Sequence, residues 1–142
     1  MRHLGIDFGE RRIGLAISDE MARIATPLTT IERTSDAQAI AEIVAIIEIE
    51  DVQQLVLGEP RRLDGSRGPA ADRISSFARK LGEATGLAIT LVDEALTTHQ
   101  AAERLASVPG SSRERLDAVA AQIILQEALD RSPRAEVPEG PE

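Results

Sequence analysis

Apolar and polar positions along the chain predict short strands that alternate with helices. Apolar runs of strand length occupy residues 3–8, 11–18, 26–32, 52–57 and 87–92. The first three runs follow one another with only short connections, which predicts an antiparallel meander. The last two are each preceded by a stretch with helical spacing of its apolar residues, which is typical of parallel strands joined by helices.

Four helices are predicted between and after these strands. Ser35 is suited to cap the first, whose apolar residues recur at helical spacing up to Ile47, and Pro69 suits the first turn of the second. Capping-box patterns precede the other two, Thr97 with Gln100 for a helix to Leu105 and Ser111 with Glu114 for a helix to about Leu129. This order predicts an α/β fold, a five-stranded mixed sheet with helices on both faces.

Length and composition predict one domain over residues 1–131 and a disordered acidic tail over residues 132–142. The tail is rich in proline and glutamate and too poor in apolar groups to pack. The chain has no cysteine, so a catalytic or metal site would use oxygen and nitrogen groups. Because it has neither a membrane-spanning apolar run nor a signal-peptide pattern, we expect a cytoplasmic protein with no membrane partner.

Charge is distributed unevenly along the chain. The formal net charge of −8 argues against a protein that coats nucleic acid by bulk electrostatic attraction. Residues 57–80 nevertheless hold six basic residues against three acidic ones, a net charge of +3. Arg61, Arg62 and Arg67 of this segment lie in a loop rich in glycine and proline, and arginine can bind phosphate bidentately. These three loop arginines are therefore candidates for binding a nucleic-acid substrate.

Carboxylates stand where predicted strands end. Asp7 closes the first strand, and Asp93 with Glu94 closes the fifth. Ligands of open α/β sheets bind at the carboxyl ends of parallel strands, so these acids are expected at one edge. Asp117 lies on the last helix in line with small residues, which would let it approach the sheet. Two simpler interpretations stay open, Asp7 as a turn former and Asp117 as a solvent-facing helical residue.

Acids that converge in this way would repel one another strongly. An interior carboxylate is costly unless it is paired or bound to metal. Hard cations such as Mg²⁺ or Mn²⁺ favour carboxylate and water oxygens, so either ion would resolve the repulsion.

Four stretches carry a more specific signal: GIDFGERRIGLAISD, LVLGEPRRLDGSRGPAA, LVDEALTTHQAAERL and LDAVAAQIILQEAL. In order and spacing they resemble the four blocks of the YqgF (RuvX) family of RNase H-like nucleases. The resemblance implies an RNase H-like fold in which Asp7, Glu94 and Asp117 are the catalytic metal ligands. It also implies a metal-dependent nuclease that matures the 5′ end of 16S ribosomal RNA or, like related resolvases, cuts Holliday junctions.

The nuclease interpretation gives further residues a role. Two metal ions about 4 Å apart would hold the scissile phosphate, with Asp7 bridging them. The loop arginines would bind flanking phosphates. Glu10, Arg11 and Arg12 could reach the substrate from the first turn, the alternative being that one or both arginines are simply solvated.

Two positions depart from the pattern of the family. It usually has Gly-Leu-Pro where this chain has Gly58-Glu59-Pro60, and Asp-Glu-Arg where this chain has Asp93-Glu94-Ala95. Glu59 could add an acid to the site or point to solvent, and we expect the second. The missing arginine at position 95 could weaken phosphate binding.

Other classes of protein remain open at this stage. An actin-like ATPase also places an aspartate and a glycine after its first strand, but it encloses its nucleotide between two such domains. A non-catalytic RNA- or ribosome-associated adaptor would suit the low isoelectric point and Ala95. The sequence does not decide between precursor rRNA and branched DNA as substrate, nor the oligomeric state, for which a homodimer is one candidate.

Overall fold

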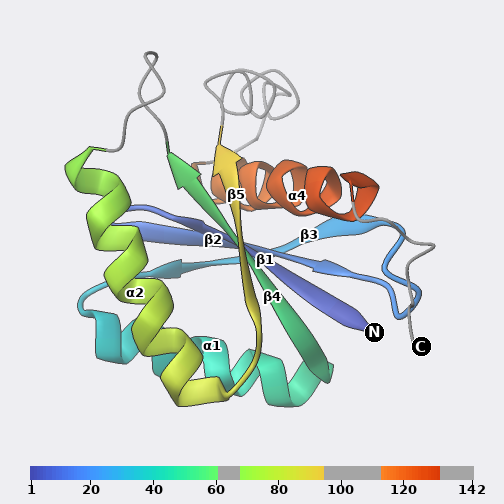
Figure 1. Ribbon diagram of the computed structural model, residues 1–142, viewed down its shortest axis with the longest axis horizontal. Coiled ribbons are helices and arrows are strands. Elements are labelled where there is room, and N and C mark those ends of the chain that lie inside the picture. Colours follow the sequence, from blue (N-terminus) through green and yellow to red (C-terminus); the bar gives the residue numbers. More distant parts are fainter. Residues whose placement is uncertain (61–67, 95–112, 132–142) are drawn as a thin grey trace, which may run out of the picture.

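The computed structural model describes residues 1–60, 68–94 and 113–131, drawn in colour in Figure 1. Within these residues the chain forms one five-stranded sheet with the strand order β3-β2-β1-β4-β5. The strands are β1 (Arg2–Phe8), β2 (Arg12–Ser18), β3 (Ala25–Glu32), β4 (Val52–Pro60) and β5 (Ile89–Glu94). The helices are α1 (Asp36–Glu50), α2 (Pro69–Thr85) and α4 (Arg113–Arg131).

The sheet is mixed, as the sequence predicts. β1, β2 and β3 pair in antiparallel fashion, which confirms the meander, whereas β1, β4 and β5 run parallel to one another. The carboxyl ends of β1, β4 and β5 therefore share one edge of the sheet. Asp7, Glu59 and Glu94 lie at or near that edge, each from a different strand.

The largest boundary differences from the sequence prediction are in β4 and β5. Residues 58–60, expected in a loop, extend β4 because they continue its ladder with β5, up to the pairing of Pro60 with Glu94. A proline is tolerated at this point since it terminates the strand. β5 begins at Ile89 rather than at residue 87. The helix predicted from Thr97, the cap at Ser111 and the tail lie outside the described residues.

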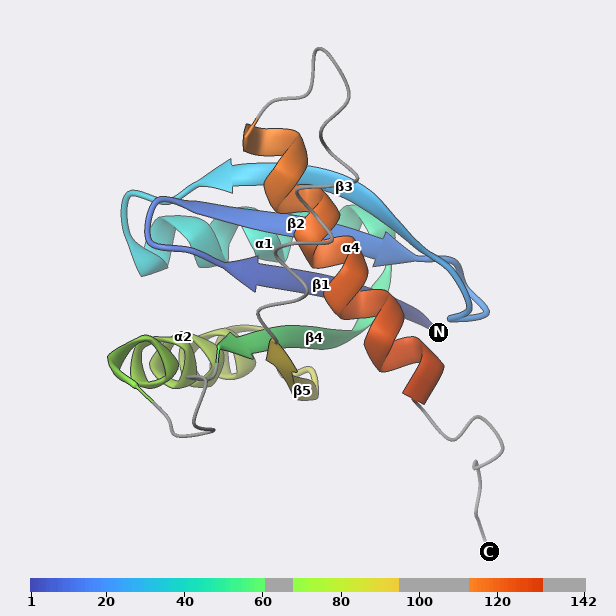
Figure 2. The ribbon, with the colours of Figure 1, turned by 90° about the horizontal axis from the view of Figure 1, so that it is seen from above.

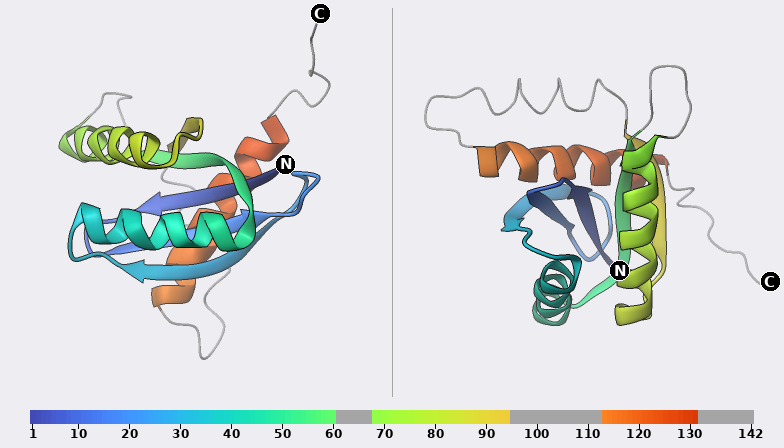
Figure 3. Two further views of the ribbon diagram at one scale, coloured as in Figure 1. Left: turned by 90° about the horizontal axis from the view of Figure 1, so that it is seen from below. Right: turned by 90° about the vertical axis from the view of Figure 1, so that its left-hand side faces the viewer.

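Helices cover both faces of the sheet (Figures 2 and 3). α1 and α2 lie on one face, where Phe77, Leu81 and Ile43 join the inward residues of the strands in the larger core cluster. The predicted capping of α1 is confirmed, because the Ser35 side chain accepts from the Gln38 N–H and the Gln38 side chain bonds in return. Pro69 begins α2 as expected. None of the described helices is long and apolar enough to cross a membrane.

α4 crosses the opposite face alone among the described helices (Figure 2). It packs directly against the backbone of the strands because two glycines, which have no side chains, lie beneath it. A Cβ at Gly5 would come 2.6 Å from Leu125 Cβ, and one at Gly14 would overlap the Asp117 carbonyl group and lie 3.0 Å from Ala118 N. Real Cβ atoms do not approach other groups this closely. The position of α4 therefore depends on the absence of side chains at these two strand residues.

We predict that Gly14→Ala destabilises the fold, because the neighbour that would have to move is helix backbone rather than a flexible side chain. Overpacking of this kind costs about 1–3 kcal/mol. Gly82→Ala is the matched control, since its Cβ would lie 3.6 Å from Ile89 Cδ1, an ordinary contact, inside a helix. It is expected to stabilise by roughly 0.5–1 kcal/mol. Urea unfolding of both variants measures this, and an unchanged midpoint for Gly14→Ala would contradict the close packing of α4.

Candidate functional site

Asp7 is a buried residue of β1. It lies opposite Gly14 in the antiparallel pair with β2, and 9% of its surface is exposed. Alternate residues of a strand share a face, so Asp7 lies on the face on which Gly5 packs beneath α4. The turn after β1 is closed by the Gly9 N–H, which donates to the Arg12 carbonyl at 3.0 Å. Asp7 is therefore a buried residue within the strand.

Asp117 lies in the first turns of α4 and is held against the sheet. Its backbone carbonyl rests on Gly14, and its side chain is 23% exposed. The Arg12 Nε donates to Asp117 Oδ2 at 2.7 Å, and Arg12 belongs to β2, two residues before Gly14 on the same face. Asp117 therefore packs against the sheet and is not a solvent-facing residue of the helix.

These contacts bring the first and last described segments of the chain together. Gly14 is the link, because Asp7 lies beside it in the sheet and Asp117 lies above it on α4. The guanidinium of Arg12 contributes the positive charge at this point. Two acids and one cation therefore meet at the carboxyl edge of β1, beneath the start of α4.

Glu94 is the last residue of β5, and its backbone pairs with Pro60. The side chains of Asp93 and Glu94 lie outside what the structure describes. Their neighbour Val92 is buried in the core cluster beneath α4, on the same face of the sheet as Asp7. The backbone therefore brings this pair of acids to the expected edge.

Glu59 differs from the sequence prediction. It is 5% exposed, whereas the sequence favoured a solvent-facing side chain. Leu55 and Leu57 belong to the core cluster on the α1 and α2 side, so strand alternation places Glu59 on that side too. Glu59 is thus a buried residue on the face opposite Asp7.

Several basic residues of the segment 57–80 are paired with acids. Arg73 contacts Glu10 at 3.2 Å, Lys80 contacts Asp36 at 3.2 Å and Arg79 contacts Glu83 at 3.6 Å. Arg11 is exposed in the turn between β1 and β2, beside the site. Arg61, Arg62 and Arg67 lie outside the described residues.

Both phenylalanines serve the core rather than a nucleic-acid surface. Phe8 and Phe77 pack with ring centroids 4.5 Å apart, and the Arg33 guanidinium lies 5.1 Å from the Phe8 centroid. Phe77 is fully buried. Phe77 belongs to the larger core cluster, and Phe8 packs against that cluster.

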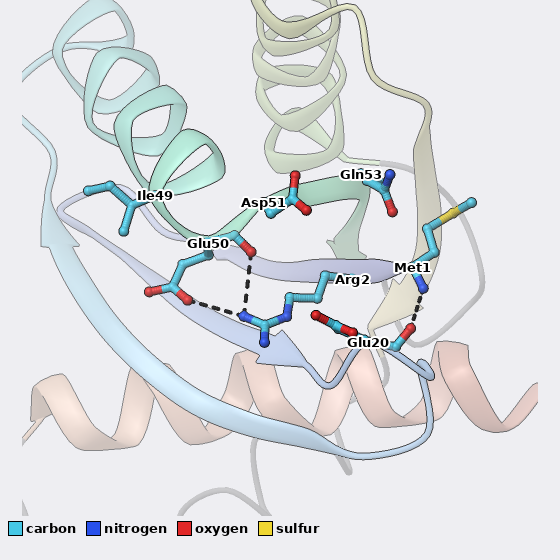
Figure 4. A pocket seen from close by; sticks show the side chains of 7 residues that line it. All are labelled: Met1, Arg2, Glu20, Ile49, Glu50, Asp51 and Gln53. Carbon is cyan, nitrogen blue, oxygen red and sulfur yellow. Dashed lines mark hydrogen bonds and ion pairs between the residues drawn. The ribbon is translucent and has the colours of Figure 1, made fainter.

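A cavity of about 410 Å³ lies at the other end of the sheet (Figure 4). It is lined by Met1, Arg2, Glu20, Ile49, Glu50, Asp51 and Gln53. Arg2 pairs there with Glu50 at 3.3 Å, and the amino terminus donates to the Glu20 carbonyl. This end begins β1 and β4, so the cavity is separate from the carboxyl edge that holds Asp7.

Asp19 lies at that distal end, in the turn that follows β2. The pKa of Asp19 is lowered because the backbone N–H groups of Ile24 and Arg23, and then Met21, donate to its carboxylate. Asp19 therefore organises the turn between β2 and β3 and is committed to backbone donors. It is not a member of the acid pair on the α4 face.

The donor set at the carboxyl edge suits a hard divalent cation. Asp7 and Asp117 offer carboxylate oxygens, and the Arg12 guanidinium shows that Asp117 is placed to bind a positive charge. Among the side chains that the structure describes, no three His, Cys, Asp or Glu gather as a ligand set. The sequence predicts a third carboxylate at the end of β5, where Asp93 and Glu94 stand.

The sequence prediction singled out neither Gly14 nor the pairing of Arg12 with Asp117. A glycine in the interior of a strand often marks a close backbone approach, so Gly14 was detectable in principle. The Arg12 pairing was not, because its partner lies 105 residues away and depends on where α4 crosses the sheet.

Comparisons with known proteins agree with this architecture. A protein of Syntrophus aciditrophicus is 39% identical over 141 residues, covering 97% of this chain and 94% of its own. One of Chloroflexus aurantiacus is 43% identical over 130 residues, covering 89% and 85%. Both bear the name "Putative pre-16S rRNA nuclease".

Solved structures show the same fold at low sequence identity. RuvC of T. thermophilus in complex with a Holliday junction substrate has a TM-score of 0.59 at 16% identity, covering 91% of this chain and 94% of its own. The fowlpox virus Holliday junction resolvase has a TM-score of 0.55 at 12% identity, covering 92% and 99%. These neighbours confirm the RNase H-like sheet. The chain therefore belongs to the RuvX family, whose model, described as Holliday junction resolvase, matches residues 1–131.

Proposed function

We propose that this protein is a metal-dependent nuclease that hydrolyses phosphodiester bonds, with Asp7, Glu94 and Asp117 as ligands of Mg²⁺ or Mn²⁺. One observation carries the proposal: β1 and α4 bring Asp7 and Asp117 to either side of Gly14 at the carboxyl edge of the sheet. Two acids at a partly buried site repel each other, and the Arg12 guanidinium supplies a single positive charge beside them, so a divalent cation would offset the repulsion further. Membership of the RuvX family supports the same chemistry.

The chain's own residues would perform two tasks in this reaction. The carboxylates fix the position of the cation, and Asp7 is the most firmly placed of them because it lies within the sheet and is 9% exposed. When bound, divalent ions supply a nucleophilic water at neutral pH and stabilise the charge on the phosphate. Arg11 and the loop arginines would hold the flanking phosphates of the substrate.

Strand alternation assigns the third carboxylate. Val92 lies in the cluster beneath α4, so position 94, two residues later, is expected on the α4 face with Asp7. Position 93 is expected on the other face. We therefore propose Glu94 as the metal ligand in preference to Asp93.

Precursor 16S rRNA is the substrate that we propose. The support is the name borne by relatives that are 39% and 43% identical, whereas the resolvase structures share only 12–16% of their residues with this chain. Action on ribosomal RNA would place the protein in the cytoplasm. The family description favours a second candidate, the Holliday junction.

We predict that Asp7→Asn abolishes Mn²⁺-dependent cleavage while the fold survives, because the amide keeps the shape of the side chain and removes the ligand charge. Cleavage of a precursor rRNA 5′ end and circular dichroism measure the two properties. Asp51→Asn is the matched control, since Asp51 is exposed at the distal end and has a φ of 57°, a conformation that asparagine also tolerates. Full activity in Asp7→Asn would refute the assignment.

At the end of β5 we predict that Glu94→Gln lowers Mn²⁺ affinity and cleavage, whereas Asp93→Asn retains metal binding. The reason is that side chains alternate between the two faces of a strand, and Val92 lies on the α4 face, so position 94 is expected there too. Calorimetric titration with Mn²⁺ separates the two variants. If Asp93→Asn lost metal binding and Glu94→Gln kept it, the ligand would be the neighbouring residue and the expected alternation would be wrong.

The substrate prediction is that one preparation, with one metal, cleaves a precursor 16S rRNA 5′ end faster than a four-way DNA junction. Both substrates are compared at the same salt concentration, because phosphate contacts make binding salt-dependent. Faster resolution of the junction would favour the second candidate. An absence of Mn²⁺ binding would instead favour a non-catalytic adaptor.

A further inference from the structure

The ion pair between Arg12 and Asp117 lies inside the proposed metal site. The Arg12 Nε donates to Asp117 Oδ2 at 2.7 Å, a short charge-assisted hydrogen bond. The two side chains are 28% and 23% exposed, so the pair is shielded on most sides. Asp117 is therefore engaged by a side-chain cation at the place where its oxygen would bind a metal ion.

A guanidinium and a divalent ion on one carboxylate would repel each other. Their separation would be well below the Debye length of about 8 Å at physiological salt, so mobile ions would not screen them. Asp7 is the neighbouring acid, and its position in the sheet is fixed. Arg12, by contrast, is the first residue of β2, directly after the turn, and has a long side chain that can reorient.

We propose that Arg12 is an exchangeable cation of this site. It neutralises Asp117 until a divalent ion binds, and it is then released to bind a phosphate of the nucleic-acid substrate. This inference rests on the proposed function, because it takes Asp117 as a metal ligand. It assigns Arg12 a part in substrate binding that follows metal binding, whereas Arg11 and the loop arginines would bind phosphate with or without metal.

A different role for Arg12 gives the opposite result in a titration. If Arg12 stayed on Asp117 and oriented it for the metal, its removal would weaken metal binding, typically by 10–100-fold. If Arg12 competes with the metal, its removal strengthens metal binding. The sign of the change therefore distinguishes exchange from orientation.

The first experiment is calorimetric titration of Mn²⁺ into the wild-type chain and Arg12→Ala. Exchange predicts about tenfold tighter binding in Arg12→Ala, because one positive charge beside the site is lost. Arg12→Lys keeps the charge and is expected to bind Mn²⁺ with nearly wild-type affinity. Arg2→Ala is the matched control, since Arg2 forms a similarly exposed pair with Glu50 at the distal end, and its removal should not change Mn²⁺ affinity.

The second experiment measures binding of a fluorescein-labelled single-stranded RNA from a precursor 16S leader at several salt concentrations. With Ca²⁺ present, Arg12→Ala should reduce the slope of log affinity against log salt by about 0.7, the loss of one phosphate contact on a single strand. With EDTA the slope should equal that of the wild-type chain. An equal loss of slope in both conditions would mean that Arg12 binds phosphate independently of metal and would overturn the exchange.

A third measurement is made on the wild-type chain, and a variant serves only to assign the signal. The Nε–Hε resonance of Arg12, assigned by its absence from the spectrum of Arg12→Lys, should lose its hydrogen-bonded shift when Mg²⁺ is added to the wild-type chain. An unchanged resonance at saturating Mg²⁺, or unchanged or weaker Mn²⁺ binding in Arg12→Ala, overturns the proposal. Suppose that one of these overturning results is found while the wild-type chain binds Mn²⁺ and Asp117→Asn does not. Asp117 is then still a metal ligand, and only the exchange of Arg12 is refuted. If the wild-type chain binds no Mn²⁺, the proposed function fails with it.

Discussion

The close packing of α4 on the sheet is the contact on which the rest of the site depends. Gly14 has no side chain, so the backbone of α4 at Asp117 can rest directly on β2. The same glycine is the partner of Asp7 across the antiparallel pair. A single side chain at this position would push α4 away and separate two acids that lie at opposite ends of the chain. The absence of a side chain at Gly14 thus lets the fold bring the two acids together.

Electrostatics follows from that geometry. Asp7 is nearly buried and Asp117 is mostly covered, so bringing them together requires positive charge nearby. The chain supplies one such charge itself through Arg12. Under the proposed function a divalent ion would supply more, and the two cations would then compete for the same carboxylate. Metal binding and the release of Arg12 would for this reason be coupled.

Much of this architecture could be predicted from local patterns, and the remainder depends on tertiary contacts. Ser35 and Pro69 begin helices as predicted, because capping and the fixed φ of proline act over a few residues. The face of the sheet on which Glu59 lies could not be predicted. Residues 55–57 of β4 are all apolar, so the sequence shows no alternation of apolar and polar residues that would distinguish the two faces. The pairing of Arg12 with Asp117 spans 105 residues and exists only once α4 has crossed the sheet.

The most direct test of a metal site at the carboxyl edge is a crystal structure with Mn²⁺, located by its anomalous scattering. We expect a manganese peak coordinated by the carboxylates of Asp7 and Asp117, with the Arg12 guanidinium no longer on Asp117. Carboxylate oxygens at about 2.0–2.3 Å from the peak would establish coordination. A peak only at the distal cavity beside Glu50, or no peak in a crystal soaked at saturating Mn²⁺, would contradict the account.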